Sequence, residues 1–394
     1  MRALARLVHR WVGLAVAVVL FISGLTGVLL VGLRPLDRIV NAELFASGLA
    51  AQETWPADVY DEIARRLTAE FPSSRLIYRL PRTPDASMQV HVVGEWHGEV
   101  FFDASGAERG RRADGEGIFN WVFELHSSLL SEGTGKTVLF VCAIAYLLLF
   151  TAGLVAWWPK RLRSGFVLQL GRGPRRAVFD LHRVGGAVLG LVVLVSVSSG
   201  SYMAYRPLSV WIAHLAGSPP QPPPSLAAAP LDPLTQPRLR LSSVIATADT
   251  ALGQSRVSIV DWPPAGGIRV RKQLSDEVHP NGLSSVWLDP STGAVVRETA
   301  WRDADAAVRG FEFIYPLHIG ELGGWIHSVL ILIAGVALAF LAGSGPFLWL
   351  SRRWARRLKP AALPPAVRLG RGVVSDDQPV QKEAPGGLRT GLRE

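Results

Sequence analysis

The chain has 394 residues, of which 49% are hydrophobic and only 19% are charged, and its formal net charge is +9. An ordinary soluble domain carries about 25% charged residues, so this composition argues against a soluble enzyme and against a disordered chain. The single cysteine, Cys142, excludes a disulfide framework and a cysteine-ligated zinc or iron–sulfur site.

Four segments contain no Asp, Glu, Lys or Arg, and each is 22 or 23 residues long: 11–33, 137–158, 184–205 and 329–350. A helix needs about 20 apolar residues to cross the hydrocarbon core of a bilayer, so the sequence predicts four membrane spans. The first apolar run is too long for a signal peptide, and no small-residue cleavage site precedes Arg34-Pro35. We therefore interpret it as an uncleaved anchor.

Basic residues are concentrated on one side of the predicted membrane. Residues 1–10, 159–183 and 351–394 hold 20 Lys and Arg in 79 residues, whereas 34–136 and 206–328 hold 21 in 226. Because basic segments favour the cytoplasm, both termini and the 159–183 loop are predicted to be cytoplasmic, and the two long segments to lie outside. The charge flanks membrane spans without a binding motif, so it indicates topology and not a nucleic-acid partner.

The chain contains an internal repeat. A His-Arg pair opens the first and third spans, at His9 and His182, and a glycine stands eighteen residues after each histidine, at Gly27 and Gly200. A Leu-His pair recurs before the second and fourth spans, at His126 and His318. A span, an outer segment and a second span therefore form one unit that occurs twice in the same direction. We expect a pseudo-two-fold axis along the membrane normal.

The predicted fold is an α-helical membrane protein with four transmembrane helices in two parallel repeats and two small α+β lobes outside the membrane. The expected order is a cytoplasmic N-terminus with the first span (1–33), the first lobe (34–136), the second span (137–158), a cytoplasmic loop (159–183), the third span (184–205), the second lobe (206–328), the fourth span (329–350) and a basic cytoplasmic tail (351–394). The proline-rich residues 217–237 are predicted to form an extended tether, and the tail beyond Lys359 to be disordered.

Each lobe is predicted to contain one helix followed by short strands. The helices are expected at residues 57–70 and 241–252. The strands are expected at 75–80, 88–93 and 99–103 in the first lobe and at 257–262, 268–272, 285–289 and 294–298 in the second. In both lobes a strand ends in an Asp-initiated turn with a glycine, at residues 103–106 and 289–293.

Four of the nine histidines occupy repeat-matched positions at the borders of the predicted membrane. The two-fold relation brings His9 opposite His182 on the inner side and His126 opposite His318 on the outer side. Two imidazoles that converge in a bundle core can be axial ligands of a b-type haem, so the sequence predicts two haem sites. The alternatives are histidines that anchor in lipid headgroups and a histidine-only copper or zinc site.

Two glycines and a further histidine complete the candidate sites. Gly27 and Gly200 lie on the same helix faces as the inner histidines, about five turns further on, where they would let a flat macrocycle approach the helix. His327 follows His318 by nine residues, which points it to the opposite face of an unbroken helix. Gly323-Gly324 can break that helix, so His327 stays a candidate ligand.

Charged residues near these sites are weaker candidates. Three arginines on the inner side can pair with haem propionates: Arg6, Arg10 and Arg183. The favoured interpretation is that they anchor the helices on the cytoplasmic side, as the positive-inside rule predicts. Acidic residues expected near the outer site can contact a substrate; they are Glu124, Glu132 and Glu321. The remaining histidines are expected to be ordinary lobe residues: His91, His97, His214 and His279. No residue is assigned a catalytic role.

The segments His9-Arg10-Trp11-x-Gly13, Leu181-His182-Arg183-x-x-Gly186 and Leu317-His318-x-Gly320, with the two Asp-turn lobes, resemble the PepSY-associated transmembrane family. This family includes bacterial iron-regulated inner-membrane proteins and siderophore reductases of the ferrioxamine reductase type. The resemblance implies four helices, two periplasmic PepSY-like lobes, bis-histidine haem b and electron passage across the inner membrane to a periplasmic ferric complex. The first half departs from the pattern after His126, where Ser127-Ser128 replaces the Ile-Gly that follows His318.

The resulting hypothesis is a membrane ferric reductase with two haem b groups and a ferric siderophore as its substrate. The inner loop of 25 residues is too short for a flavin or nicotinamide domain, so the electron donor must be a separate cytoplasmic partner or a membrane quinol. One alternative is a membrane-anchored PepSY module that regulates a peptidase or acts as a sensor, which predicts no cofactor. A siderophore permease is disfavoured because the spans contain no charged residue.

Overall fold

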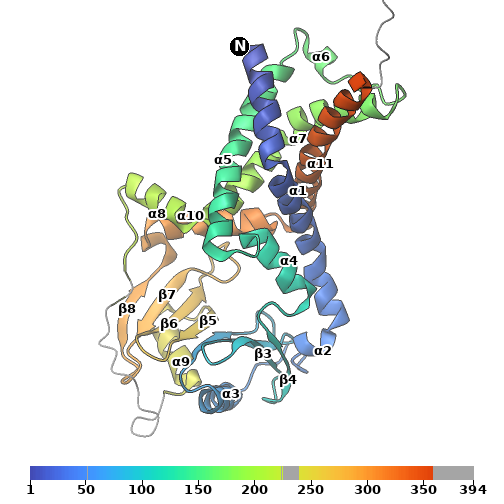
Figure 1. Ribbon diagram of the computed structural model, residues 1–394. Coiled ribbons are helices and arrows are strands. Elements are labelled where there is room, and N and C mark those ends of the chain that lie inside the picture. The colour runs from blue at the N-terminus through green and yellow to red at the C-terminus, as the bar shows by residue number, and fades with distance from the viewer. Residues whose placement is uncertain (51, 223, 225–238, 358–394) are drawn as a thin grey trace, which may run out of the picture. The chain divides into compact units, whose positions relative to one another are not determined.

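Four long helices form a bundle (Figure 1). The computed structural model describes residues 1–50, 52–222, 224 and 239–357. Within these residues, four helices are long and apolar enough to cross a membrane: α1 (Arg2–Val40), α5 (Glu132–Trp157), α7 (Pro174–Ala204) and α11 (Gly324–Arg357) (Figure 1). All four predicted spans fall on these helices, to within one residue at their ends.

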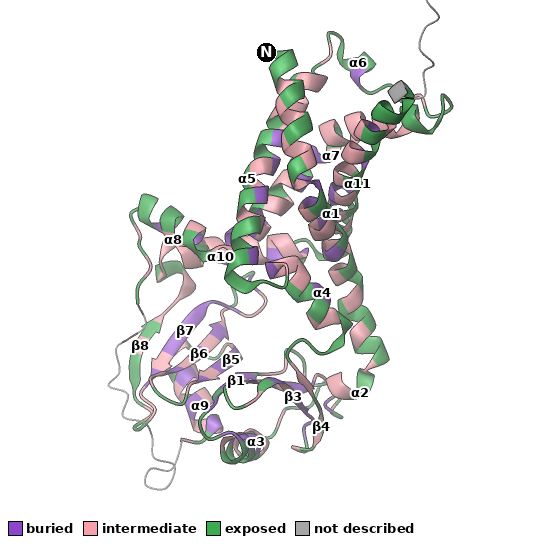
Figure 2. Ribbon diagram, in the orientation of Figure 1, coloured by how far each residue is buried: buried purple, intermediate pink, exposed green. Residues whose placement is uncertain are grey.

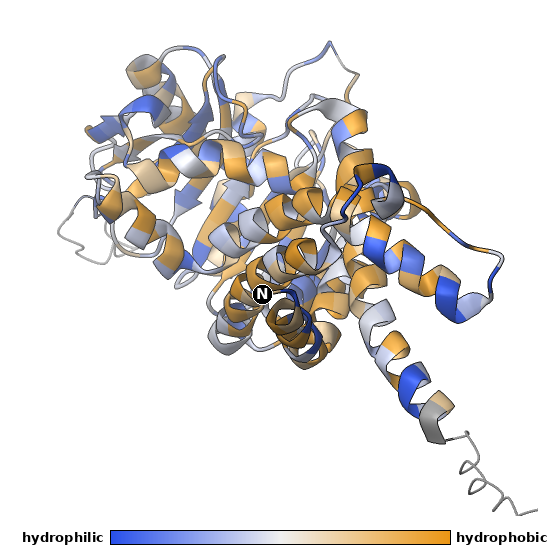
Figure 3. Ribbon diagram, turned by 90° about the horizontal axis from the view of Figure 1, so that it is seen from above, coloured by the Kyte–Doolittle hydropathy of each residue, from blue (hydrophilic) through white to orange (hydrophobic). Residues whose placement is uncertain are grey.

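The surface of this bundle is suited to lipid. At most 22% of the most apolar window of each long helix is buried inside the protein. The helices around the marked N-terminus are predominantly hydrophobic when viewed from above (Figure 3). So much exposed apolar surface is stable only where hydrocarbon surrounds it, which makes the chain a membrane protein.

The first helix of one repeat packs closely against the last helix of the other. A Cβ atom on Gly24 of α1 would lie 2.7 Å from the backbone nitrogen of Ala339 and 2.9 Å from the carbonyl oxygen of Gly335 in α11. A Cβ atom on Gly335 would in turn lie 2.8 Å from Cγ2 of Val28. Only glycine allows two backbones to approach this closely, as in other pairs of membrane helices.

Among the described residues, eight strands form one antiparallel sheet in the order β4-β3-β2-β1-β5-β6-β7-β8. The strands are β1 (Arg75–Arg79), β2 (Met88–Val93), β3 (His97–Phe102), β4 (Glu108–Ala113), β5 (Arg256–Trp262), β6 (Ile268–Gln273), β7 (Ser284–Leu288) and β8 (Val295–Thr299). The two repeats meet where β1 pairs with β5, with Tyr78 opposite Val260. The lobes therefore share a single sheet, a junction that the sequence did not indicate.

One face of the sheet is covered by two helices, α3 (Ala57–Glu70) and α9 (Leu241–Leu252), as predicted for each lobe. Every second residue of β2 and β6 is buried, which is the alternation expected of a sheet with one covered face. The core between sheet and helices includes Leu67, Tyr78, Val90, Val260 and Val270, each at most 1% exposed (Figure 2). Full burial of such side chains contributes about 1.5–3 kcal/mol each.

The predicted turns after β3 and β7 are confirmed. Oδ1 of Asp103 accepts a hydrogen bond from the backbone nitrogen of Ser105 at 2.9 Å, and Gly106 has a φ of 80°. Oδ1 of Asp289 accepts one from the backbone nitrogen of Ser291 at 2.8 Å. These Asx turns direct the chain from one strand into the next.

Several short helices and one strand were not predicted from the sequence. Strand β4 has the sequence Glu-Arg-Gly-Arg-Arg-Ala, which lacks apolar alternation because it is an edge strand with polar surroundings. One short helix precedes the second long helix of each repeat: α4 (Gly117–Ser128) in the first repeat and α10 (Ala306–Ile319) in the second. The other short helices are α2 (Ala42–Phe45), α6 (Leu162–Gly165), α8 (Arg206–Leu215) and the 3₁₀ turn Trp301–Asp303. Most of the predicted tether and the tail beyond Lys359 lie outside the described residues.

Candidate cofactor sites

Two pairs of histidines face each other across the bundle. The ring centroids of His9 (α1) and His182 (α7) are 6.0 Å apart, with the ring planes at 84°. Those of His126 (α4) and His318 (α10) are 6.1 Å apart, with the planes at 34°. The structure thus brings together the histidines that the repeat paired, and each pair takes one ring from each half of the chain.

In two of these rings a backbone carbonyl defines the position of the proton. Nδ1 of His9 lies 2.9 Å from the carbonyl oxygen of Leu149, and Nδ1 of His318 lies 3.0 Å from that of Ser196. A carbonyl oxygen can only accept a hydrogen bond, so Nδ1 carries the proton in both neutral rings. The lone pair therefore lies on Nε2.

In the other two rings a hydroxyl group lies within hydrogen-bond distance of Nδ1. Nδ1 of His126 lies 2.9 Å from Oγ1 of Thr26, which donates its own proton to the carbonyl oxygen of Ile22 at 2.7 Å. Nδ1 of His182 lies 2.7 Å from Oγ of Ser344, which donates to a carbonyl oxygen at 3.2 Å. Each hydroxyl can accept from Nδ1 while it donates to its carbonyl, and this arrangement again leaves Nε2 unprotonated.

The helix residues that hold the lobe-side pair repeat in sequence. Ser23-Gly-Leu-Thr26-Gly27 in α1 corresponds to Ser196-Val-Ser-Ser199-Gly200 in α7. Thr26 and Ser199 each contact Nδ1 of the lobe-side histidine of their own half, at 2.9 and 3.1 Å. The sequence analysis missed this hydroxyl, although it directly precedes the matched glycine in both halves.

The matched glycines make room for the same rings. A Cβ atom on Gly27 would lie 3.2 Å from Cε1 of His126, and one on Gly200 would lie 2.7 Å from Cε1 of His318. The glycines thus lie against the histidines of the lobe-side pair, about five turns away from the inner histidines, as their spacing requires. The predicted contact of these glycines with a macrocycle stays a prediction.

The spacing of both pairs fits an iron held between two axial imidazoles. A metal–imidazole bond is about 2.0–2.1 Å long and the ring centroid lies roughly 1.1 Å behind the nitrogen, which puts the two centroids about 6.3 Å apart. The observed 6.0 and 6.1 Å are close to this value. Neutral rings with Nδ1 hydrogen-bonded and Nε2 free are also the usual form of metal-bound histidine.

A site made only of side-chain ligands has less support. Across the described ranges, no group of three or more His, Cys, Asp or Glu residues could hold a metal ion. Zinc and copper sites in proteins take three or four such ligands, whereas a haem iron receives four nitrogens from its macrocycle and needs only two axial ligands. The histidine pairs therefore fit haem better than a histidine-only copper or zinc site.

The helix that carries His318 does break before His327. Helix α10 ends at Ile319 and is followed by Gly320, with a φ of 81°, and α11 begins at Gly324, with a φ of 62°. Nδ1 of His327 is buried, and it has no hydrogen-bond partner in the part of the chain that the structure describes. A ligand role for His327 stays a prediction.

Arg183, Arg10 and Arg6 contact backbone and aromatic groups of the protein, and their predicted role as anchors stays a prediction. Arg183 donates to the carbonyl oxygens of Gly165 at 2.8 Å and Val167 at 2.6 Å, so it fixes the loop between α5 and α7. The guanidinium of Arg10 lies 5.1 Å from the ring centroid of Trp11. Nε of Arg6 donates to a backbone carbonyl oxygen one turn earlier, at 3.3 Å.

The acidic residues predicted near the lobe-side pair are distributed around it. Glu124 lies on α4 together with His126, and Glu132 is the first residue of α5. Glu321 directly follows the end of α10 and lies 3.4 Å from Nη1 of Arg34 and 3.9 Å from Nη1 of Arg82. Their predicted contact with a substrate stays a prediction.

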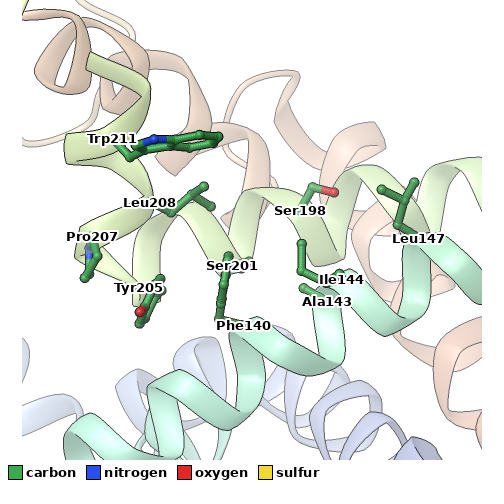
Figure 4. Close-up of a pocket in the computed structure, with 10 residues that line it drawn as sticks. All are labelled: Phe140, Ala143, Ile144, Leu147, Ser198, Ser201, Tyr205, Pro207, Leu208 and Trp211. Carbon is green, nitrogen blue, oxygen red and sulfur yellow. The ribbon is translucent and has the colours of Figure 1, made fainter. Parts of the chain in front are cut away.

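A hollow of about 560 Å³ lies between α5, α7 and α8 (Figure 4). Its wall is apolar and aromatic, and the rings of Phe140 and Tyr205 stack there with centroids 4.4 Å apart. Ser198 and Ser201 point to this side of α7, whereas Ser196 and Ser199 lie on the opposite side of the helix. The hollow therefore faces away from the lobe-side histidine pair and is not part of that site.

A histidine of the second lobe packs directly on the helix that carries His318. The ring centroid of His279 lies 4.5 Å from that of Tyr315 and 5.6 Å from that of Phe311, both on α10. His279 is 2% exposed, so it is a core residue of the lobe, in agreement with the prediction. It connects the loop after β6 to the lobe-side site.

The surroundings of His279 favour its neutral form. Burial, followed by the positive charges of Arg271 and Arg82, lowers the pKa of His279 to about 3. Oε1 of the fully buried Glu312 accepts a hydrogen bond from the backbone nitrogen of His279 at 2.9 Å. Burial is also the main reason why the pKa of Glu312 is raised. This part of the lobe disfavours added charge.

The comparison with known families agrees with this architecture. The sequence pattern of the PepSY-associated TM region matches residues 6–352, a range that contains both histidine pairs and the whole sheet. No curated protein matches the sequence significantly. Since the match covers nearly the whole chain, the protein belongs to the family of the PepSY-associated TM region.

Proposed function

We propose that the protein is a haem b protein of the bacterial inner membrane that moves electrons across the membrane and reduces a periplasmic ferric complex, namely an Fe(III)-siderophore. The observation that supports this most is the presence of two pairs of imidazoles at the spacing of axial ligands, each ring held at Nδ1 by a carbonyl or hydroxyl oxygen. A b-type haem bound by each pair supplies one-electron redox chemistry.

The distance between the two histidine pairs suits electron transfer from one side of the membrane to the other. His9 and Thr26, the residue that holds His126, are seventeen positions apart on α1, which is about 25 Å along the helix axis. The hydrocarbon core is about 30 Å thick, so the pairs lie near its two borders. The distribution of basic residues supports an orientation with the His9 end in the cytoplasm and the lobes in the periplasm.

The protein itself supplies binding and orientation. Carbonyl and hydroxyl acceptors hold each ring in one tautomer, and the apolar helices keep water away from the rings. Each electron converts one Fe(III) to Fe(II) in the substrate, and chelators built for Fe(III) hold Fe(II) weakly. The electrons come from a separate donor, by class a cytoplasmic protein or a membrane quinol.

The test is an absorption spectrum of the detergent-purified protein, oxidised and dithionite-reduced, with a haem count after extraction. We expect about two six-coordinate b haems per chain. His9→Ala and His318→Ala should each lose about one haem, from different ends of the bundle. The control is His97→Ala, which removes an exposed histidine of β3 and should keep both.

A colourless protein from haem-replete cells, or an unchanged haem count in both pair variants, would overturn the proposal. The alternative of a membrane-anchored PepSY module that regulates a peptidase or acts as a sensor would then become the leading one. That alternative leaves the free Nε2 atoms without a function.

A further inference from the structure

The sheet face opposite α3 and α9 carries one row of side chains that crosses the second lobe. Arg269 of β6 pairs with Trp287 of β7, and Trp287 pairs with Arg297 of β8. On the other side, Arg269 pairs with Asp261 of β5. Neighbouring rows, such as the one with Val270 and Val286, point into the core, so this row points away from α3 and α9.

The two arginines enclose the tryptophan. The guanidinium carbon of Arg269 lies 5.5 Å from the ring centroid of Trp287, and that of Arg297 lies 5.8 Å from it. Trp287 is partly exposed, unlike its neighbours in β7, which are buried. The result is an aromatic surface with a cation on each side, which we call the Arg–Trp row (Arg269, Trp287 and Arg297).

Positive charge at the Arg–Trp row is not balanced by acids. Arg269 donates to the hydroxyl of Ser285 at 2.9 Å, and Arg297 donates to the carbonyl oxygen of Pro222 at 3.1 Å. The nearby carboxylate of Asp261 is bound by Nε of Arg75 at 2.6 Å and by a second nitrogen of the same guanidinium. One acid thus lies among several arginines.

The surroundings of Arg269 lower the pKa of its guanidinium. Burial, opposed by Asp261 and reinforced by Arg297, Arg206 and Arg75, lowers the pKa of Arg269. Cations that lower each other's pKa are stabilised by a bound anion, because an anion removes the repulsion. A half-buried guanidinium is also a better anion donor than an exposed one, since less water competes with the ligand.

The corresponding face of the first lobe is neutralised by its own acids. Nη1 of Arg79 donates to Oε1 of Glu99 at 3.1 Å, and Arg112 binds both carboxylate oxygens of Asp37, at 2.9 and 3.0 Å. The two halves of one sheet therefore differ in charge, although the chain built them by the same repeat. Among the described residues, Arg269 and Arg297 form no ion pair with an acid, and both lie in the second lobe.

A series of neighbouring residues leads from the Arg–Trp row to the lobe-side histidine pair. Arg271 lies on the same face of β6, two residues after Arg269. The charge of Arg271 acts on His279, whose ring stacks on Tyr315 of α10. Tyr315 precedes His318 by three residues, about one helical turn.

We propose that the Arg–Trp row binds the substrate as an anionic ferric chelate, before the substrate reaches the lobe-side site. This inference rests on the proposed function and narrows it to chelates with net negative charge. The arginines pair with carboxylate or catecholate oxygens of the ligand, and the face of Trp287 packs on its flat surface. A cationic chelate such as ferrioxamine B is disfavoured by the same arginines.

Binding can be tested without redox chemistry by using gallium(III), which has the charge and coordination of iron(III) but is not reduced. Calorimetric titration of the full-length protein in detergent compares gallium(III) citrate, an anion, with the gallium(III) complex of desferrioxamine B, a cation. We expect binding of the anion only, and weaker binding at high salt. Arg269→Gln and Arg297→Gln should each weaken it about tenfold, the effect of one lost charge-assisted hydrogen bond.

Arg79→Gln is the matched control, because it removes an arginine from the same sheet face that already has an acid partner; it should bind the anion as well as the unchanged protein. Equal binding of both chelates, or anion binding that is insensitive to Arg269→Gln and Arg297→Gln, would overturn the inference. Loss of haem in these two variants would also overturn it, since the arginines would then serve the cofactor. A haem-free protein that still binds the anion would contradict the proposed function only.

Discussion

Thr26 and Ser199 occupy equivalent positions in α1 and α7, and each contacts Nδ1 of the lobe-side histidine of its own half, at 2.9 and 3.1 Å. The residue after each is a glycine that makes room for the ring. Two adjacent residues thus orient a side chain about a hundred residues away in each half. Orientation of this kind is what a metal-bound histidine requires, and it can be tested at both positions.

Thr26→Val keeps the shape of the side chain and removes the acceptor of His126 Nδ1. Loss of an outer-shell partner typically lowers metal affinity about 10–100-fold, so we expect the lobe-side haem to dissociate more readily. The measurement is the rate of haem transfer to an excess of apomyoglobin. Thr151→Val, which removes a hydroxyl that bonds only a carbonyl within α5, should leave the rate unchanged.

The two matched glycines should not be equally sensitive to a methyl group. The Cβ atom of Gly200→Ala would lie 2.7 Å from Cε1 of His318, whereas that of Gly27→Ala would lie 3.2 Å from Cε1 of His126. The first distance requires the ring to move and the second requires only a small adjustment. We expect Gly200→Ala to alter the reduced absorption bands of the lobe-side haem clearly, and Gly27→Ala to alter them weakly. The reverse order would contradict the geometry.

Gly24→Ala should destabilise the contact between α1 and α11. The new methyl group would lie 2.7 Å from the backbone nitrogen of Ala339, and overpacking of this kind costs about 1–3 kcal/mol. The measurement is the midpoint of thermal unfolding in detergent. Gly32→Ala on the same helix meets no atom within 4 Å and should be neutral or stabilising, because alanine has the higher helix propensity.

His279 should make the stability of the second lobe depend on pH. Its pKa falls from 6.5 to about 3 on folding, so the unfolded chain binds more protons between these values. The contribution of neutral His279 is fully present above pH 6.5 and is lost as the pH falls toward 3. Between pH 6.5 and 5 the loss is about 2 kcal/mol.

The variant His279→Phe keeps an aromatic ring against Tyr315 and removes the titrating group. The midpoint of unfolding, measured at pH 7.5 and 5, should fall less in this variant than in the unchanged protein. The raised pKa of Glu312 acts in the opposite direction, and it is present in both proteins, so it cancels in the comparison. An equal fall in both proteins would exclude His279 as the cause.

Periodicity and repetition in the sequence predicted most of the elements. The charge-free runs gave the four long helices, because a hydrocarbon environment excludes charged side chains. The strands other than β4 followed from apolar alternation, since the sheet has one covered face, and helix α3 followed from apolar residues at helical spacing. Edge strand β4 and the short helices α4 and α10 had no such pattern, and α4 and α10 carry the lobe-side histidines.

The sequence by itself determined which residues form the pairs, since a duplicated unit places His9 opposite His182 and His126 opposite His318. Only the tertiary structure decided how each ring is held, because the partners of Nδ1 lie on helices far along the chain, at Thr26, Leu149, Ser196 and Ser344. It also decided that β1 pairs with β5 and joins the lobes. Register across that sheet brings Arg269, Trp287 and Arg297 into one row. Hydrogen bonds and register depend on residues that are distant in sequence, and no local pattern encodes them.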